Sequence, residues 1–184
     1  MLNATNFPFI TDGVLRRNMD AAFVHLTELA FLSGLAKYGD ASKSSFRKTA
    51  IVYTASIIEA MLLWYLKSKF PEASLKRESK IFKITKDIYN INELEKIVLG
   101  KYVQKTENVR FSKLNLADIN NYCREKGIIN HTLYKDVEVV RKLRNRLHIG
   151  TLSVIETDYS KADLEFVFSI AKRVKHMFSL VSER

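Results

Sequence analysis

Apolar side chains recur every three or four positions through most of this chain, which is the pattern of amphipathic helices. The first such stretch covers residues 14–38, with Asp12 placed to cap its start and Gly39 to end it. The second covers residues 44–69 and is apolar on nearly every side between positions 51 and 66. We therefore expect this second helix to be the central and most buried element.

Three stretches in the second half of the chain show the same helical spacing. They cover residues 113–126, 133–149 and 160–181. Residues that commonly cap helices precede two of them, namely Asn130 or Thr132, and Ser160 with Asp163, which forms a capping box with Asp in place of Glu. Together the five stretches predict an all-α fold, an up-and-down bundle of about five helices.

Residues 79–112 break the helical pattern. β-Branched and aromatic residues around a polar interruption favour two strands, at about 80–90 and 96–105. A helix over residues 93–104 is the alternative. We expect a small β-hairpin, inserted into a single helical domain that spans residues 1–184.

The composition agrees with one folded domain. At 184 residues and 47% hydrophobic content the chain can bury a core, and only 6 Gly and 2 Pro argue against disorder. The lone Cys123 excludes an intramolecular disulfide and suggests a reducing compartment. The start lacks the basic region of a signal peptide, and Thr54, Ser56 and Glu59 interrupt the longest apolar run. We expect a cytoplasmic protein that does not cross a membrane.

The net charge of +10 points to a polyanionic partner. Residues 101–150 carry eleven Lys and Arg against five Asp and Glu, so the excess gathers in one part of the chain. RNA is the natural partner, held through phosphate contacts that salt weakens. Charge alone leaves simple solubility open as the alternative.

The helix expected over residues 133–149 carries the strongest chemical signal. Four polar side chains fall on one of its faces, at positions i, i+3, i+4 and i+7. They are Arg141, Arg144, Asn145 and His148. A second face, which would be buried, holds Val137, Val140, Leu143 and Leu147, and a third, which would be solvated, holds Lys135, Glu138, Lys142 and Arg146. A plain surface helix needs only two faces, so the extra polar face indicates a site.

An Arg-Asn dipeptide followed by His on a late helix resembles the motif of the HEPN superfamily, the higher eukaryote and prokaryote nucleotide-binding domains. That motif is an Arg, a usually polar residue and a His, with four to six residues between Arg and His. Arg141 has six residues between it and His148 but is followed by Lys142. Arg144 is followed by Asn145, but only three residues separate it from His148. Either arginine can be the motif arginine.

A second stretch carries the same resemblance. Residues 46–64, which contain the pair Glu59-Ala60 in their middle part, look like the buried second helix of many HEPN domains. The resemblance implies a metal-independent endoribonuclease of a defence or toxin–antitoxin system that needs no cofactor. It also implies a homodimer in which two motif helices line one cleft, with a cognate antitoxin or regulatory protein as a further partner.

The chemistry follows from the residue types. Cleavage of RNA by its own 2′-hydroxyl needs a base, an acid and positive charge near the phosphorus. His148 titrates near neutral pH and is the candidate base or acid. Arg144 or Arg141 would hold the phosphate through paired N–H donors, and Asn145 would orient His148 or a phosphate oxygen. No metal site is expected, because the other histidines and Cys123 stand at no ligand spacing.

Each of these residues also has a structural interpretation. His148 can be a histidine that interacts with the dipole at a helix C-terminus. Arg141 and Arg144 can be structural, since the buried Glu59 needs a partner and we expect that partner on the motif helix. Two other functions stay open: a HEPN-like module that binds RNA or nucleotide without cutting, and a partner-binding protein whose basic face meets an acidic protein.

Overall fold

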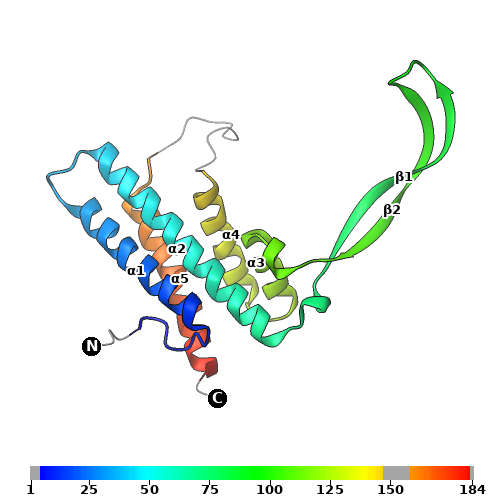
Figure 1. The fold of residues 1–184 in the computed structure, drawn as a ribbon. Helices are drawn as coiled ribbons and strands as arrows, with labels where there is room; N and C mark the ends of the chain where they lie inside the picture. Colours follow the sequence, from blue (N-terminus) through cyan, green and yellow to red (C-terminus); the bar gives the residue numbers. More distant parts are fainter. Residues whose placement is uncertain (1–4, 147–157, 183–184) are drawn as a thin grey trace. The chain divides into compact units, whose positions relative to one another are not determined.

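A computed structural model of the chain describes residues 5–146 and 158–182, in which five α-helices and one two-stranded antiparallel sheet occur (Figure 1). The helices are α1 (Gly13–Gly34), α2 (Asp40–Lys69), α3 (Leu116–Glu125), α4 (His131–Asn145) and α5 (Lys161–Ser182). The strands are β1 (Lys76–Asn90) and β2 (Lys96–Asn108), flanked by single 3-10 turns at Glu72–Ser74 and Phe111–Lys113. The chain forms two compact units, a helical one and a hairpin unit over Phe70–Lys113.

α2 is the core of the helical unit, as its all-round apolar sequence predicted. It packs against α1, α3, α4 and α5 (Figure 1). Its fully covered side chains include Ile51, Ile58, Met61, Leu62 and Leu66. By length and composition alone α2 could also cross a membrane, a test that the buried core helices of other folds pass as well. Half of its apolar window is buried within the protein, and Tyr53 and Ser56 on one side of the helix are exposed.

The helix starts follow the capping residues seen in the sequence. The Asp12 side chain accepts hydrogen bonds from the backbone N–H groups of Val14 and Leu15, and Asn130, one of the two proposed caps of α4, accepts one from Leu133. Ser160 and Asp163 bond each other's backbone N–H groups, as a capping box requires.

Helix ends agree less well with the sequence. α1 ends at Gly34 rather than near position 38, because Leu35 leaves the helical conformation with φ −74° and ψ 133°. α2 then begins at Asp40, four residues earlier than expected, so the connection between the two helices is a short turn. The described part of α4 ends at Asn145, and the residues expected to continue it to position 149 lie outside the described residues.

The hairpin is a large part of the structure, so the expected all-α class with a small insertion is wrong. β1 has 15 residues and β2 has 13, and among the described residues 62% are helical and 17% lie in strands. The alternative of a helix over residues 93–104 is wrong as well. The pairing runs from Asn90↔Lys96 to Lys76↔Asn108, beyond the apolar positions that suggested the strands. Main-chain hydrogen bonds hold these additional strand residues together. Such bonds do not depend on side chains, so the hydrophobic pattern of the sequence does not predict them.

Burial makes Cys123 of α3 chemically inert. Its side chain is fully covered, with Sγ 3.9 Å from the carbonyl oxygen of Leu62 in α2. Loss of solvent disfavours the thiolate and raises the pKa of this thiol to about 12.

We predict that the folded protein reacts negligibly with a thiol reagent such as DTNB at pH 8, because the reactive thiolate is nearly absent. One thiol per chain should react after unfolding in guanidinium. Since the unfolded thiol ionises near pH 8.5, stability should also fall as the pH rises above about that value. Rapid labelling of the native protein at pH 8, with retained helical circular dichroism, would contradict the burial of Cys123.

Candidate functional site

α4 brings Arg141, Arg144 and Asn145 together on the C-terminal half of one helix. Its buried side chains are Leu133, Val137, Val140 and Leu143, which confirms the predicted apolar face as far as the structure describes it. Asn145 is exposed, and both arginines are half-buried. His148, the expected acid or base, and Leu147 lie outside the described residues.

Arg144 joins α4 to the core helix. Its Nη1 donates to Oε2 of Glu59 on α2 at 2.5 Å, and the two side chains are 33% and 22% exposed. This contact confirms that the carboxylate of Glu59 finds its partner on the motif helix. A guanidinium has five N–H donors, so the bond to Glu59 orients Arg144 and leaves donors for a further acceptor.

Arg141 is held by a carboxylate as well, through a chain that reaches α3. Its Nε donates to Oε2 of Glu138 at 2.9 Å. The Nδ2 of Asn120, which is completely buried on α3, donates to the other oxygen of Glu138 at 3.0 Å and to the Tyr134 carbonyl at 3.0 Å. Glu138 is therefore only 21% exposed, and its expected place on a solvated face is wrong because α3 covers it. Asn120 is a positioning residue that sequence reasoning missed.

The two arginines form an oriented pair. They stand at i and i+3, so their Cβ atoms are about 5–6 Å apart on one helix face. Each is held by a carboxylate on one side and keeps between a quarter and a third of its side chain exposed, 27% for Arg141 and 33% for Arg144. Two partly exposed guanidiniums on one helix face carry planar forks of N–H donors, a group that suits a phosphate or another oxyanion.

Tyr159 ties the end of α4 to the start of α2. Its hydroxyl donates to the carbonyl of Leu143 at 3.3 Å, and its N–H donates to the hydroxyl of Ser44 at 2.9 Å. Arg47 donates to the Tyr159 carbonyl at 3.1 Å, and the Lys48 ammonium lies 5.6 Å from the centre of the Tyr159 ring. Figure 1 shows the start of α2, the end of α4 and the start of α5 at one end of the helical unit. Arg47 and Lys48 thus add positive charge at that end.

Arg47 and Lys48 are visible in the sequence as two adjacent cations, but the sequence does not show that they lie near the motif helix. Arg47 and Lys48 lie seven and eight residues after the start of α2, just before its apolar stretch, and look like ordinary surface charges. One detail sets Arg47 apart: its Nε is buried and has no hydrogen-bond partner among the described residues. Only the packing of Tyr159 between α2 and α4 brings this pair towards the motif helix.

The described part of the site supplies positive charge and hydrogen-bond donors. Of the described histidines, His25 is on α1, His131 starts α4, and His176 lies fifteen residues into α5 from its start, away from the C-terminal end of α4. Within residues 5–146 and 158–182 no three His, Cys, Asp or Glu side chains converge to hold a metal ion.

We predict an energetic coupling between Arg144 and Glu59. In a double-mutant cycle with Glu59→Gln and Arg144→Met, the coupling should be about 1 kcal/mol, because both side chains are partly covered and solvent screens the rest. The exposed pair Lys161–Glu165 of α5 is the matched control and should couple close to zero. Urea unfolding measures both cycles, and equal couplings would contradict a special role for the Arg144 contact.

Comparisons of this chain with protein-family models, with curated proteins and with solved structures found no match. The resemblance to HEPN domains therefore rests on the motif helix and on the second helix of this chain. What the described geometry adds to that resemblance is the ion pair between these two helices, Arg144 with Glu59.

Proposed function

We propose that this protein is a metal-independent endoribonuclease of the HEPN type, acting as a homodimer in a defence or toxin–antitoxin system. The observation that carries the proposal is the pair of oriented arginines, Arg141 and Arg144, shortly before His148 in the chain. The +10 charge supports an RNA substrate.

In the proposed reaction the 2′-hydroxyl of the substrate attacks the adjacent phosphorus while a base removes its proton. The bond from phosphorus to the 5′-oxygen breaks, and an acid protonates that oxygen. The products are a 2′,3′-cyclic phosphate and a 5′-hydroxyl. His148 fills one role in each subunit, and the guanidiniums of Arg141 and Arg144 bind the non-bridging oxygens, on which negative charge grows. Asn145 orients His148 or the phosphate.

The two arginines differ in what their loss would do. Arg144 ties α4 to α2, so its removal affects stability as well as phosphate binding. Arg141 is tied to Glu138 of its own helix, so its removal leaves the contact between α2 and α4 in place. Replacement by Lys keeps the charge of either residue but removes the planar fork of donors, which separates phosphate recognition from charge alone.

We predict that the protein cleaves total RNA in the presence of EDTA, leaving 2′,3′-cyclic phosphate ends. His148→Ala should lower the rate at least about 100-fold through loss of acid–base catalysis. Arg141→Lys and Arg144→Lys should lower it about tenfold or more. Lys142→Met, which removes an exposed charge from the same helix, is the matched control and should change little. Thermal unfolding of each variant checks the fold, and undiminished cleavage by folded His148→Ala would contradict the mechanism.

The hairpin provides a second cationic surface for RNA. One face of its ladder carries five basic side chains and one acid, and the basic ones are Arg77, Lys83, Lys86, Lys101 and Lys105. Lys83 stands directly opposite Lys101, and like charges in that position repel each other. The opposite face carries three basic and two acidic side chains, so the positive charge is concentrated on one side. A polyanion bound there would relieve the repulsion.

We predict that Lys83→Met with Lys101→Met weakens RNA binding roughly tenfold at low salt, because two phosphate contacts are lost. The slope of the binding constant against salt should become shallower in the same variant. Lys76→Met with Lys80→Met removes the same charge from the opposite face and is the control. Fluorescence anisotropy with the catalytically silent His148→Ala background measures binding alone. Equal losses in both pairs would show that only the total charge matters.

A non-cutting RNA-binding module is the second candidate. It is favoured by the fact that both arginines are already neutralised by carboxylates, as purely structural arginines are. Salt-dependent RNA binding without products, from a folded wild-type dimer, would support this candidate. Absence of RNA binding at low salt would instead favour a protein partner.

A further inference from the structure

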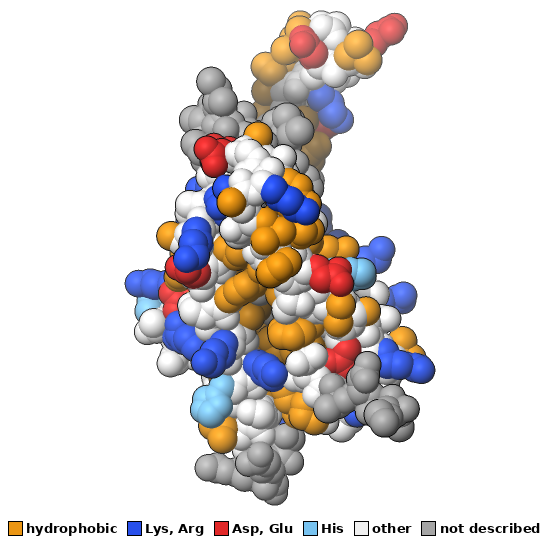
Figure 2. All heavy atoms as spheres, turned by 90° about the vertical axis from the view of Figure 1, so that its left-hand side faces the viewer, with side chains coloured by type: hydrophobic (Ala, Val, Ile, Leu, Met, Phe, Trp, Pro, Cys, Tyr) orange, Lys and Arg blue, Asp and Glu red, His pale blue; other side chains and the backbone are white. Residues whose placement is uncertain are grey.

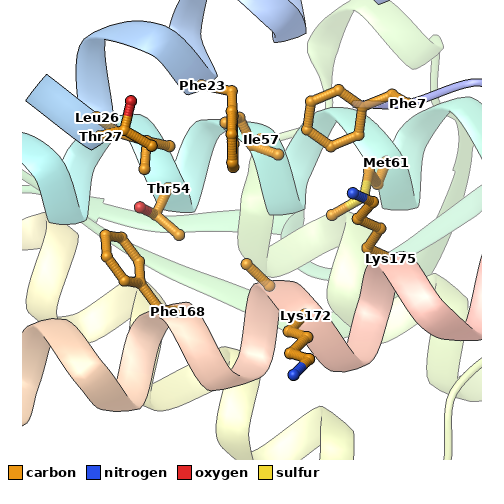
Figure 3. Close-up of a pocket in the computed structure, with 11 residues that line it drawn as sticks. Phe7, Phe23, Leu26, Thr27, Thr54, Ile57, Met61, Phe168, Lys172 and Lys175 are labelled. Carbon is orange, nitrogen blue, oxygen red and sulfur yellow. The ribbon is translucent and has the colours of Figure 1, made fainter. Parts of the chain in front are cut away.

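A pocket of about 420 Å³ lies between α1 and α5, over one side of α2 (Figure 3). This volume falls within the roughly 300–1,000 Å³ typical of small-molecule sites. Three aromatic rings line it, Phe7, Phe23 and Phe168, and Ile57 and Met61 of α2 lie between them. The face of the helical unit drawn in Figure 2 carries apolar side chains along its middle, with Lys and Arg side chains beside them.

The end of the pocket at Phe7 is built by specific contacts. Thr5 donates through its hydroxyl to Asp20 of α1 at 2.6 Å, and the N–H of Asn6 donates to the same carboxylate at 2.8 Å. The Phe7 ring meets Phe23 edge-on, with the ring centres 6.1 Å apart. Phe7 is only 2% exposed. The pocket is therefore closed by an anchored segment rather than by a loose side chain.

Polar ligands find few partners inside this pocket. Of the two hydroxyls in its lining, Thr27 donates to the Val24 carbonyl at 2.8 Å and Thr54 donates to the Ala50 carbonyl at 2.7 Å. Both donors are thus already used within their own helices. Burying sugar or base polar groups against the remaining carbon surface would leave those groups without hydrogen bonds, which costs free energy.

Among the described residues that line the pocket, the charged ones are two lysines of α5, and none is an acid. Lys175 is half-buried, and its ammonium lies 5.4 Å from the centre of the Phe7 ring. Figure 3 shows Lys175 reaching towards Phe7 and Met61, whereas Lys172 points away from the other lining residues. The pocket thus joins a carbon-lined interior to an ammonium group at its edge.

We propose that this pocket binds a single-chain anionic amphiphile, such as a fatty acid carboxylate or an alkyl phosphate. The hydrocarbon chain lies among the three phenylalanine rings, and the anionic head pairs with Lys175. Charge complementarity selects this occupant, since Lys175 offers a cation and none of the described lining residues is an acid. The limited volume and the closed end at Phe7 favour one chain over a partner helix. The proposal does not depend on RNA cleavage.

Calorimetric titration with octanoate, decanoate and dodecanoate, below their micelle concentrations, tests the proposal on the full chain. We expect one site per chain and an affinity that rises about fourfold per added methylene, as burial of each methylene predicts. Decanol, which has the same chain without the charge, should bind more weakly than decanoate. Absence of saturable binding at every chain length, or equal binding of decanol and decanoate, would overturn the proposal.

Three variants locate the ligand. Lys175→Met removes the ammonium but keeps an unbranched stem, and it should weaken decanoate binding about tenfold. Ala171→Leu fills the pocket from α5 and should weaken decanoate and decanol alike by tenfold or more. Lys161→Met is the control. Lys161 lies about 21 Å from Lys175 along the same helix, so its loss should leave the affinity for decanoate unchanged. An equal loss with Lys161→Met, or no loss with Ala171→Leu, would overturn the assignment to this pocket.

A sedimentation experiment with lipid vesicles distinguishes binding of a dissolved amphiphile from binding to a membrane surface. If sedimentation with anionic phosphatidylglycerol vesicles is strong and unaffected by Ala171→Leu, while decanoate does not bind, the lysines serve a membrane surface and the proposal fails. Competition of decanoate with vesicle binding, lost in Ala171→Leu, would support the pocket. If decanoate changed the oligomeric state of the protein but did not bind to it at saturation, the proposal would be contradicted.

Discussion

The helical unit depends on the burial of α2. Because this helix is apolar around nearly its whole circumference between Ile51 and Leu66, one neighbour cannot cover it, and water on any side would be costly. α1, α3, α4 and α5 together cover most of its apolar side chains, while Tyr53 and Ser56 stay exposed. Each of them presents its apolar stripe to α2, which turns its polar face outwards. The direction of the arginine face of α4 is therefore a consequence of the need to bury α2.

Glu59 is a charged residue within the apolar part of α2, and it contacts a residue of the candidate site. A carboxylate beside the core is tolerated because Arg144 pairs with it, and the same pairing fixes the guanidinium in one orientation. Ile57 and Met61, two residues to either side of Glu59, line the pocket between α1 and α5. One segment of α2 thus contacts both the motif helix and the apolar pocket.

The hairpin follows a different principle. Two strands alone bury little apolar surface, and an isolated hairpin is marginal in water. Main-chain pairing nevertheless continues along charged positions to Lys76 and Asn108. Gly100 allows the two strands to pair closely at this point. A Cβ there would come within 2.8 Å of the Lys83 carbonyl oxygen and would overlap the Phe82 ring. Phe82 instead packs edge-on against Tyr102 across the ladder, with ring centres 5.3 Å apart.

The sequence by itself determined the features that depend on neighbouring positions in the chain. Helical spacing located the five helices, and Asp12, Asn130 and Ser160 marked three of their starts, because a cap bonds N–H groups two or three residues away. All-round apolarity identified α2 as the core. The spacing of Arg141, Arg144 and Asn145 placed them on one face before any contact was known.

Only the tertiary structure decided which distant residues meet. Arg144 and Glu59 are 85 positions apart, and the sequence could only say that Glu59 needed some partner. Glu138 looked solvated until Asn120 of α3 covered it, and the pocket exists only because α1 and α5 pack on the same helix at a distance from each other. The physical reason is that periodicity records which way a side chain faces on its own helix, whereas its partner is set by how the helices pack together.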